Sequence, residues 1–222
     1  MEHNTETARD RIRDSIGLTQ RLFDDEEISG LIVRAAEAMS QSLKQGGRLL
    51  FCGNGGSAAD AQHFAAELSG KFLIDREPLD AEALHVNSSF LTAVANDYGY
   101  AEIYSRMVYA KGRSGDVLIG ISTSGNSANI VHAFESAHRI GMRTIGLTGE
   151  GGGRMAGLSD VLIAVPSRSA PRIQESHLLI GHILCELVEA VPSSGPGFSG
   201  WGPALRQAAA GMAGGVAFKA GL

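Results

Sequence analysis

The sequence predicts an α/β fold: a three-layer α/β/α sandwich around a central, mainly parallel sheet of five strands, preceded by N-terminal helices. Short runs that are apolar on both faces, such as RLLFC and DVLIGI, alternate with helical stretches between residues 48 and 190. This alternation is typical of a parallel sheet that helices cover on both sides. A chain of 222 residues with 44% hydrophobic content is long enough for one substantial core. Glycine-rich and hydroxyl-rich loops follow two of the strands, where ligands bind in such sheets.

Residues 5–45 are predicted to form two helices. Their apolar sides are made by Ile12, Ile16, Leu22 and Phe23 in the first helix, and by Ile28, Leu31, Ile32, Ala35, Ala36 and Met39 in the second. We assign residues 1–45 to N-terminal helices within the same domain, residues 46–190 to the sandwich, and residues 191–222 to a C-terminal extension. The extension is rich in Gly, Ala and Pro, so we expect it to be flexible, with a short helix near residues 204–212.

The elements of the sandwich follow from the apolar pattern. Strands are predicted at residues 48–52, 83–86, 116–121, 143–147 and 160–165. Helices are predicted at residues 57–68, 91–95, 102–110, 126–140 and 174–190. The helices fall between the strands, as the crossover connections of parallel strands require.

Composition narrows the classes of partner. A net charge of −5 does not favour binding to nucleic acid. No apolar run approaches the roughly 20 residues that cross a bilayer, so a membrane partner is not expected. Cys52 and Cys185 lie in apolar runs, which favours two free, buried thiols over a disulfide. We therefore expect a cytoplasmic protein.

The first candidate loop is GNGGS at residues 53–57, between a predicted strand and a predicted helix. Its glycines allow a tight turn and a close approach to a ligand. Ser57 is a suitable N-cap, and the helix start that follows favours an anion. The spacing matches neither the dinucleotide-binding fingerprint nor the P-loop. Taken alone, the loop is equally compatible with an ordinary strand-to-helix turn.

The second candidate loop, STSGNS at residues 122–127, gathers four hydroxyl groups at the end of another strand: Ser122, Thr123, Ser124 and Ser127. Hydroxyl and amide donors without Lys or Arg suit a phosphate monoester. The alternative is a polar cap that uses one of these side chains. Because one serine would suffice for capping, we favour phosphate binding. A third glycine loop at residues 149–153 is interpreted as a flexible turn.

His63 and Glu67 lie four residues apart on the helix that begins at the first loop, so both project from one face. They form either a solvent-exposed ion pair or a site pair, as metal ligands or as a general base with its partner. Spacing alone favours the ion pair. The phosphate loop at the start of the same helix gives a reactive carboxylate an evident use.

Gln174, His177 and His182 lie on the last predicted helix, where Gln174 and His182 can face one cavity at different heights. Either histidine can also be a core or surface residue without further function. Together with His63 and Glu67, these nitrogen and oxygen donors would suit zinc, although their spacing alone is weakly specific.

Four segments of the sequence resemble one family of sugar-phosphate proteins. They are CGNGGSAADAQHFAAEL at residues 52–68, AND at 95–97, GISTSGNS at 120–127, and RIQESH at 172–177 with His182 beyond it. In this order they resemble the sugar isomerase (SIS) family, most closely its phosphoheptose isomerases, which act on sedoheptulose 7-phosphate. The resemblance runs from about residue 12 to residue 190 and implies the flavodoxin-like SIS fold for residues 46–190.

The resemblance also implies roles for individual residues. Substrate would be bound by Asn54, Gly55, Gly56, Ser57, Glu67, Asn96, Asp97 and Gln174, and its phosphate by Ser122, Thr123, Ser124 and Ser127. One zinc ion per subunit would be bound by His63, Glu67, Gln174 and His182. Members of this family form homotetramers whose active sites are lined by neighbouring subunits, so the N-terminal helices would serve assembly.

The activity that the resemblance implies is the isomerisation of sedoheptulose 7-phosphate to D-glycero-D-manno-heptose 7-phosphate, for heptose and glycoconjugate biosynthesis. This aldose–ketose conversion moves a proton between C1 and C2 through an enediol(ate), and a carboxylate and an imidazole can transfer it. A Lewis-acid metal can stabilise the enediolate. We hypothesise that Glu67 is the base at carbon and that His182 is its partner at oxygen.

The alternative function is that of a non-catalytic SIS protein that binds the bacterial replication initiator. That branch lacks the carboxylate and the imidazole found here at Glu67 and His182. A sugar-phosphate sensor would need a DNA-binding module that residues 1–45 do not supply, and other SIS enzymes do not match HFAAEL and RIQESH. Two departures concern the positioning of the sugar. Asn87 and Ser88 stand where the family often carries an aspartate, and Pro171 stands where an acidic residue can occur.

Overall fold

The computed structural model describes residues 2–190, with side chains from residue 4 onward, and confirms the predicted α/β sandwich. Its five strands are parallel and lie in the order β2-β1-β3-β4-β5. The strands are Leu49–Gly53 (β1), Ala81–Ala83 (β2), Val117–Ser122 (β3), Arg143–Thr148 (β4) and Val161–Ala164 (β5). The α-helices are Glu2–Asp24 (α1), Glu26–Lys44 (α2), Gly56–Ser69 (α3), Ser88–Tyr98 (α4), Ile103–Lys111 (α5), Ala128–Arg139 (α6) and Ala170–Glu189 (α7). Two short 3₁₀ helices are Tyr100–Glu102 (η1) and Gly153–Leu158 (η2).

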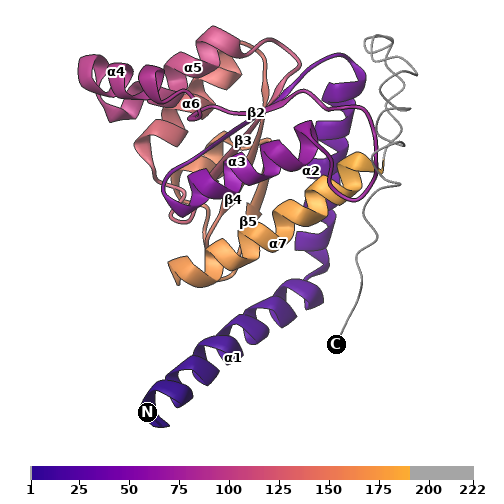
Figure 1. Ribbon diagram of the computed structural model, residues 1–222, viewed down its shortest axis with the longest axis vertical. Helices are drawn as coiled ribbons and strands as arrows, with labels where there is room; N and C mark the ends of the chain where they lie inside the picture. The colour runs from indigo at the N-terminus through magenta and orange to yellow at the C-terminus, as the bar shows by residue number, and fades with distance from the viewer. Residues whose placement is uncertain (1, 191–222) are drawn as a thin grey trace, which may run out of the picture.

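Helices cover both faces of the sheet (Figure 1). On one face, α2, α3, α7 and part of α1 pack with Leu49 and Phe51 of β1. On the other face, α4, α5 and α6 pack with Leu50 and Cys52. Successive residues of a strand point to opposite faces, and every residue of β1 is buried. The apolar run RLLFC therefore reflects burial on both sides.

The sheet order places a topological switch between β1 and β3. The chain adds β2 to one edge of β1 and then crosses over to place β3 on the other edge. Gly53 pairs with Ile121 of β3, and Ser122 pairs with Thr148 of β4, so the three strands end at one level. Ligands bind beyond the carboxyl ends of strands at such a switch. Both candidate loops open at this edge of the sheet.

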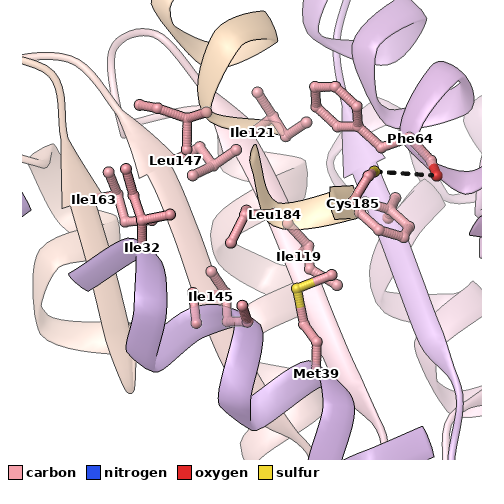
Figure 2. Packing of buried hydrophobic residues seen from close by; sticks show 14 of the residues in the cluster. Ile32, Met39, Phe64, Ile119, Ile121, Ile145, Leu147, Ile163, Leu184 and Cys185 are labelled. Atoms are coloured by element: carbon pink, nitrogen blue, oxygen red, sulfur yellow. Dashed lines mark hydrogen bonds between the residues drawn. The ribbon is translucent and has the colours of Figure 1, made fainter. Parts of the chain in front are cut away.

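The helices α3 and α7 pack directly against each other. A Cβ atom on Gly181 of α7 would lie 1.9 Å from Cζ of Phe64 on α3, so the ring occupies the space that a side chain would need. One turn later, Cys185 Sγ lies 4.0 Å from the carbonyl oxygen of Phe64, as Figure 2 shows. Cys52 and Cys185 are free and buried, as predicted. Burial raises the pKa of the Cys185 thiol to about 12.

The N-terminal helices are present as predicted but differ in burial. α2 begins at its N-cap Asp25, whose Oδ1 accepts a hydrogen bond from the amide of Ile28 at 3.0 Å. α1 projects away from the sandwich (Figure 1), with Leu18 and Leu22 buried in the core. Three further apolar side chains of α1 are exposed: Ile12 (61%), Ile16 (65%) and Phe23 (80%).

Three predicted boundaries need correction. The strand expected at residues 83–86 is misplaced, because β2 ends at Ala83 and Val86 is exposed after a turn. The helix expected at 91–95 is longer, because Asn87 caps α4 by accepting a backbone amide at 3.0 Å. α7 begins at Ala170, earlier than predicted, because Pro171 fits the first turn of a helix. The extension 191–222 and its expected helix lie outside the described residues.

None of the helices in the described part of the chain is both long enough and apolar enough to cross a membrane.

The contact between α3 and α7 predicts the effect of a methyl group at Gly181. We expect Gly181→Ala to lower the free energy of unfolding by about 1–3 kcal/mol, because Phe64 must move to admit the added atom. Urea unfolding followed by circular dichroism measures this change.

Gly30→Ala in α2 is the matched control, since Gly30 is also helical and has no atom within 4 Å of an added Cβ. This substitution should stabilise the protein by roughly 0.5–1 kcal/mol, because alanine is the better helix former. Equal changes at the two positions would contradict the proposed packing of α3 on α7.

Candidate active site

The first loop joins β1 to α3, and its backbone turns through Gly55 at φ +56°. The expected N-cap role of Ser57 is wrong, because α3 begins at Gly56 and Ser57 is buried as the second residue of the helix. Gly55 is the N-cap and has no side chain with which to cap the helix. The start of α3 therefore has no side-chain cap, and the positive end of its dipole favours an anion at the sheet edge.

The hydroxyls of the second loop contact one another. Ser122 Oγ lies 3.0 Å from Ser127 Oγ and 3.5 Å from Ser124 Oγ. Ser127 is the N-cap of α6, but its side chain makes no bond to the helix amides. The alternative of a polar cap is therefore not supported. The predicted residues, with the half-buried Thr123, line the start of a second uncapped helix.

The third glycine loop supports the second loop and is more than a turn at the surface. The amide of Gly149 donates to the carbonyl oxygen of Thr123 at 3.0 Å. The amide of Met155 donates to the carbonyl oxygen of Gly125, also at 3.0 Å. A Cβ atom on Gly125 would lie 2.0 Å from the carbonyl oxygen of Gly152. The two loops therefore meet backbone to backbone, which only glycine allows at this position.

A pair of side-chain amides ties the first loop to α6. Asn54 Nδ2 donates to Asn129 Oδ1, and Asn129 Nδ2 donates to Asn54 Oδ1, each at 2.8 Å. The hydroxyl of Tyr100 also donates to Asn54 Oδ1 at 3.0 Å. Reasoning from the sequence misses Asn129, because a buried asparagine at the start of a helix has no signature of its own. The pair fixes the spacing between the starts of α3 and α6.

His63, Glu67 and His182 meet between α3 and α7, and we call these three residues the acid/base cluster. His63 Nε2 lies 2.9 Å from His182 Nε2 and 3.6 Å from Glu67 Oε1. The sum of these two distances is therefore the upper limit for the separation of Glu67 Oε1 and His182 Nε2. Phe72 stacks on His182, with 5.5 Å between ring centroids and 16° between ring planes. Because His63 also contacts a second helix, the site-pair interpretation is favoured over an isolated surface ion pair.

α7 extends from the acid/base cluster to the strand ends. A Cβ atom on Gly56 would lie 2.7 Å from Gln174 Nε2, so Gln174 rests against the first loop. Eight residues separate Gln174 from His182, which is roughly 12 Å along a helix. Among the described residues, no hydrogen bond joins Gln174 to the acid/base cluster. His177 is a core residue, and its Nε2 lies 3.1 Å from the carbonyl oxygen of Thr148.

Asn96 and Asp97 are exposed at the end of α4. Asn96 Nδ2 donates to Asp97 Oδ1 at 2.8 Å. Within the described part of the chain, no hydrogen bond connects either residue to the acid/base cluster or to the hydroxyls of the second loop. Their expected contact with sugar hydroxyls stays a prediction.

Asp60 is a second carboxylate near the acid/base cluster that reasoning from the sequence misses. It precedes His63 by three residues and Glu67 by seven. This helical spacing places it on the same face as both and is the signal that could have identified it. Its Oδ2 is buried and has no hydrogen-bond partner among the described residues. Burial raises the pKa of the Asp60 carboxyl, and the nearby His63 and His182 partly offset that rise.

The acid/base cluster supplies donors that suit zinc. Two imidazole nitrogens and a carboxylate oxygen face one another, which are common zinc ligands. In their present positions, the described residues include no group of three or more His, Cys, Asp or Glu side chains spaced to hold a metal ion. Two nitrogen ligands of a tetrahedral zinc ion are roughly 3.3 Å apart, so the rings would have to separate slightly. The donor set fits zinc, although these side-chain positions do not.

Comparison with known proteins gives one consistent result. Residues 15–149 match the SIS domain family. The phosphoheptose isomerase of Rhodospirillum rubrum is 57% identical over 158 residues, which cover 71% of this chain and 84% of that protein. The phosphoheptose isomerase of Akkermansia muciniphila is 52% identical over 162 residues, which cover 73% of this chain and 86% of that protein. The structure of the Neisseria gonorrhoeae phosphoheptose isomerase is similar, with a TM-score of 0.79, 46% identity, and coverage of 84% of this chain and 99% of that one.

His177 predicts that the stability of the protein depends on pH. Burial lowers the pKa of its imidazole from 6.5 to about 4, and the hydrogen bond to Thr148 only partly opposes this. Below pH 6.5 the unfolded chain takes up a proton that the folded protein excludes, so stability falls as pH falls from 6.5 to 4. The titration of His177 alone should lower the free energy of unfolding by about 3 kcal/mol between pH 6.5 and pH 4. Urea unfolding at a series of pH values measures it.

His177→Gln is the control, because glutamine keeps an N–H donor for the Thr148 carbonyl but does not titrate. The variant should lose the part of the pH dependence that His177 contributes. An unchanged slope of stability against pH in the variant would contradict the assignment.

Proposed function

The chain belongs to the SIS domain family and, within it, to the phosphoheptose isomerases, and from that membership we propose how its residues isomerise sedoheptulose 7-phosphate. The reaction is an aldose–ketose isomerisation of heptose biosynthesis. We infer that the product is D-glycero-D-manno-heptose 7-phosphate. The observation that carries the proposal is that Glu67 and His182, from two different helices of one subunit, both lie close to the same nitrogen atom, Nε2 of His63.

Glu67 and His182 are the proposed acid/base pair. Glu67 would remove a proton from C1 of the ketose while His182 donates a proton to the carbonyl oxygen at C2, which gives an enediol. His182 would then take the proton from the C1 hydroxyl as Glu67 returns its proton to C2, which gives the aldehyde. No atom is gained or lost in the cycle. Each such transfer contributes about 10²- to 10⁴-fold to the rate.

The phosphate of the substrate would bind at the strand ends. The starts of α3 and α6 lack side-chain caps and flank the topological switch, and helix starts of this kind favour anions. The hydroxyls of Ser122, Ser124 and Ser127 add neutral donors. From there α7 leads roughly 12 Å to His182, a length comparable with that of an extended seven-carbon sugar phosphate. The site therefore suits a long substrate that is held at one end and reacts at the other.

Zinc is the proposed cofactor, one ion per subunit, with His63, Glu67, Gln174 and His182 as its ligands. Because a lone pair bound to zinc cannot also take a proton, Glu67 and His182 would each transfer protons through an atom that does not bind the metal. The convergence of His63, Glu67 and His182 supports this proposal. Gln174 rests against the first loop, so its side chain would have to turn toward the other three ligands to join them. Zinc would act as a Lewis acid that stabilises negative charge on the enediolate oxygens.

The proposed assembly is a homotetramer with active sites at the subunit interfaces, located in the cytoplasm. The exposed apolar side chains of α1 support assembly, because Ile12, Ile16 and Phe23 border a groove of about 610 Å³ between α1 and the start of α7. The exposure of Asn96 and Asp97 also fits a role at a neighbouring subunit. The two free cysteines suit a reducing compartment.

Glu67→Gln tests the proposed base. Glutamine keeps the size of the side chain but cannot take a proton from carbon, so kcat should fall by about 10²- to 10⁴-fold. Binding of substrate, measured by calorimetry, should change little, because the phosphate loops are untouched. The reaction is followed by separating the ketose and aldose phosphates.

Glu186→Gln is the matched control, since Glu186 is an exposed carboxylate on α7. It should retain full activity. Substantial turnover in Glu67→Gln would refute the role of Glu67 as the base.

Removal of metal tests the proposed cofactor. Dialysis against a chelator should lower turnover of sedoheptulose 7-phosphate strongly, and zinc should restore it. Metal analysis should find one zinc ion per subunit in the untreated protein and little in His63→Ala. Full activity together with a zinc content near zero would contradict the proposal.

A further inference from the structure

We propose that Arg76 and Glu189 form a buried clamp that positions both Glu67 and His182 for the reaction. The inference rests on the roles proposed above for Glu67 and His182. Glu189 is the last residue of α7, and Arg76 lies in the loop between α3 and β2. Their side chains are 1% and 10% exposed, and Arg76 Nε lies 3.1 Å from Glu189 Oε2. This contact is an ion pair in which the Nε–H group is not directed at the carboxylate.

Glu189 fixes the backbone that carries Phe72. Its Oε1 accepts the amides of Leu73 at 2.6 Å and Ile74 at 2.8 Å, and its Oε2 accepts the amide of Phe72 at 3.1 Å. Burial raises the pKa of the Glu189 carboxyl, but these three hydrogen bonds and Arg76 outweigh it and hold the pKa below its ordinary value. Glu189 is therefore a carboxylate, and hydrogen bonds to a charged acceptor are the stronger kind.

The residue that Glu189 positions is in contact with His182. Phe72 stacks on the His182 ring with nearly parallel planes. A ring fixed on one face of the imidazole limits its rotation, so that Nε2 stays directed at His63. Small errors in the direction of an acid or base cost rate, because proton transfer needs aligned groups.

Arg76 holds the other half of the pair. Its Nη2 donates to the carbonyl oxygen of Glu67 at 3.0 Å, and its Nη1 donates to that of Leu68 at 2.8 Å. These carbonyl groups lie in the last turn of α3, which ends at Ser69 and has no partner for them within the helix. A guanidinium ion at this end satisfies the carbonyl groups and the negative end of the dipole. Arg76 thereby fixes the turn from which Glu67 projects.

Hydrophobic burial explains only part of the order of this loop, because Phe72 packs against the core but the two residues after it do not. The side chains of Leu73 and Ile74 are 63% and 49% exposed, so their backbone is held by polar contacts with Glu189. A buried ion pair is also a poor source of net stability, because desolvation offsets much of the attraction. The clamp joins the ends of α3 and α7, and each partner is one contact away from a proposed catalytic residue. The arrangement of the clamp therefore indicates that it positions the two proposed catalytic residues.

Phe72 provides the first test. Phe72→Leu should lower kcat by about 10-fold or more, while KM for sedoheptulose 7-phosphate stays within about 2-fold, because the phosphate loops are unchanged. Phe72→Tyr keeps a stacking ring and should restore kcat to near the value of the unmodified enzyme. Val108→Ala, in the core on the opposite face of the sheet, controls for a general loss of stability.

Glu189→Gln provides a test that does not depend on activity. The neutral amide accepts weaker hydrogen bonds, so the amides of Leu73 and Ile74 should exchange with solvent at least about 10-fold faster than in the unmodified protein, while exchange in β3 is unchanged. Glu189→Gln should also lower kcat without raising KM, as expected for Phe72→Leu.

The two readouts separate this inference from the proposed function. An unmodified enzyme inactive on sedoheptulose 7-phosphate would refute the function, and the exchange measurement would still test the clamp. Unaltered exchange at Leu73 and Ile74 in Glu189→Gln overturns the clamp. So does a kcat for Phe72→Leu within about 2-fold of the unmodified enzyme, or a loss that Val108→Ala reproduces at equal melting temperature.

Discussion

The close approach of α3 and α7 at Phe64 and Gly181 is the contact on which the active site depends. Phe64 follows His63 in the sequence, and Gly181 precedes His182, so the packing of the first pair sets the distance between the second. Any side chain at position 181 would force the helices apart, since even a Cβ atom would lie 1.9 Å from the Phe64 ring. The 2.9 Å contact between the two imidazoles is therefore a consequence of core packing, which tolerates little displacement.

The fold and much of the site follow from patterns that are local in the sequence. Strands apolar on both faces indicate a parallel sheet, and the carboxyl ends of β1 and β3 then bring the two loops together. The i, i+4 spacing of His63 and Glu67 places them on one face. The contact of His182 with His63 depends on the register of two helices that the chain separates by more than 100 residues. The residue types only suggested it as a possible zinc site, and the family resemblance was the stronger indication. The loop that carries Arg76 has no periodicity, so its contacts with Glu189 could not be predicted.

The two ends of the site differ in charge, and this difference matches their two proposed tasks, phosphate binding and proton transfer. The loops that would bind phosphate contain no Lys or Arg, and two buried ionisable groups behind the first loop are neutral. Burial raises the pKa of Cys52 and of Tyr104, whose hydroxyl donates to the Gly53 carbonyl. These two groups therefore carry no negative charge that would repel a phosphate. Ionisable side chains gather instead at the acid/base cluster, where the proposed proton transfers would occur.

The dipole of α3 links these two ends. At its last turn the helix receives a fixed positive charge from Arg76, which bonds the carbonyl groups of Glu67 and Leu68. At its first turn it has neither an acidic residue nor a side-chain cap. The protein thus satisfies the negative end of the dipole itself and leaves the positive end to an external anion. Because α3 also carries His63 and Glu67, one helix would both attract the phosphate and present the proposed base. The distance between its start and Glu67 would then set how far along the substrate the reaction occurs.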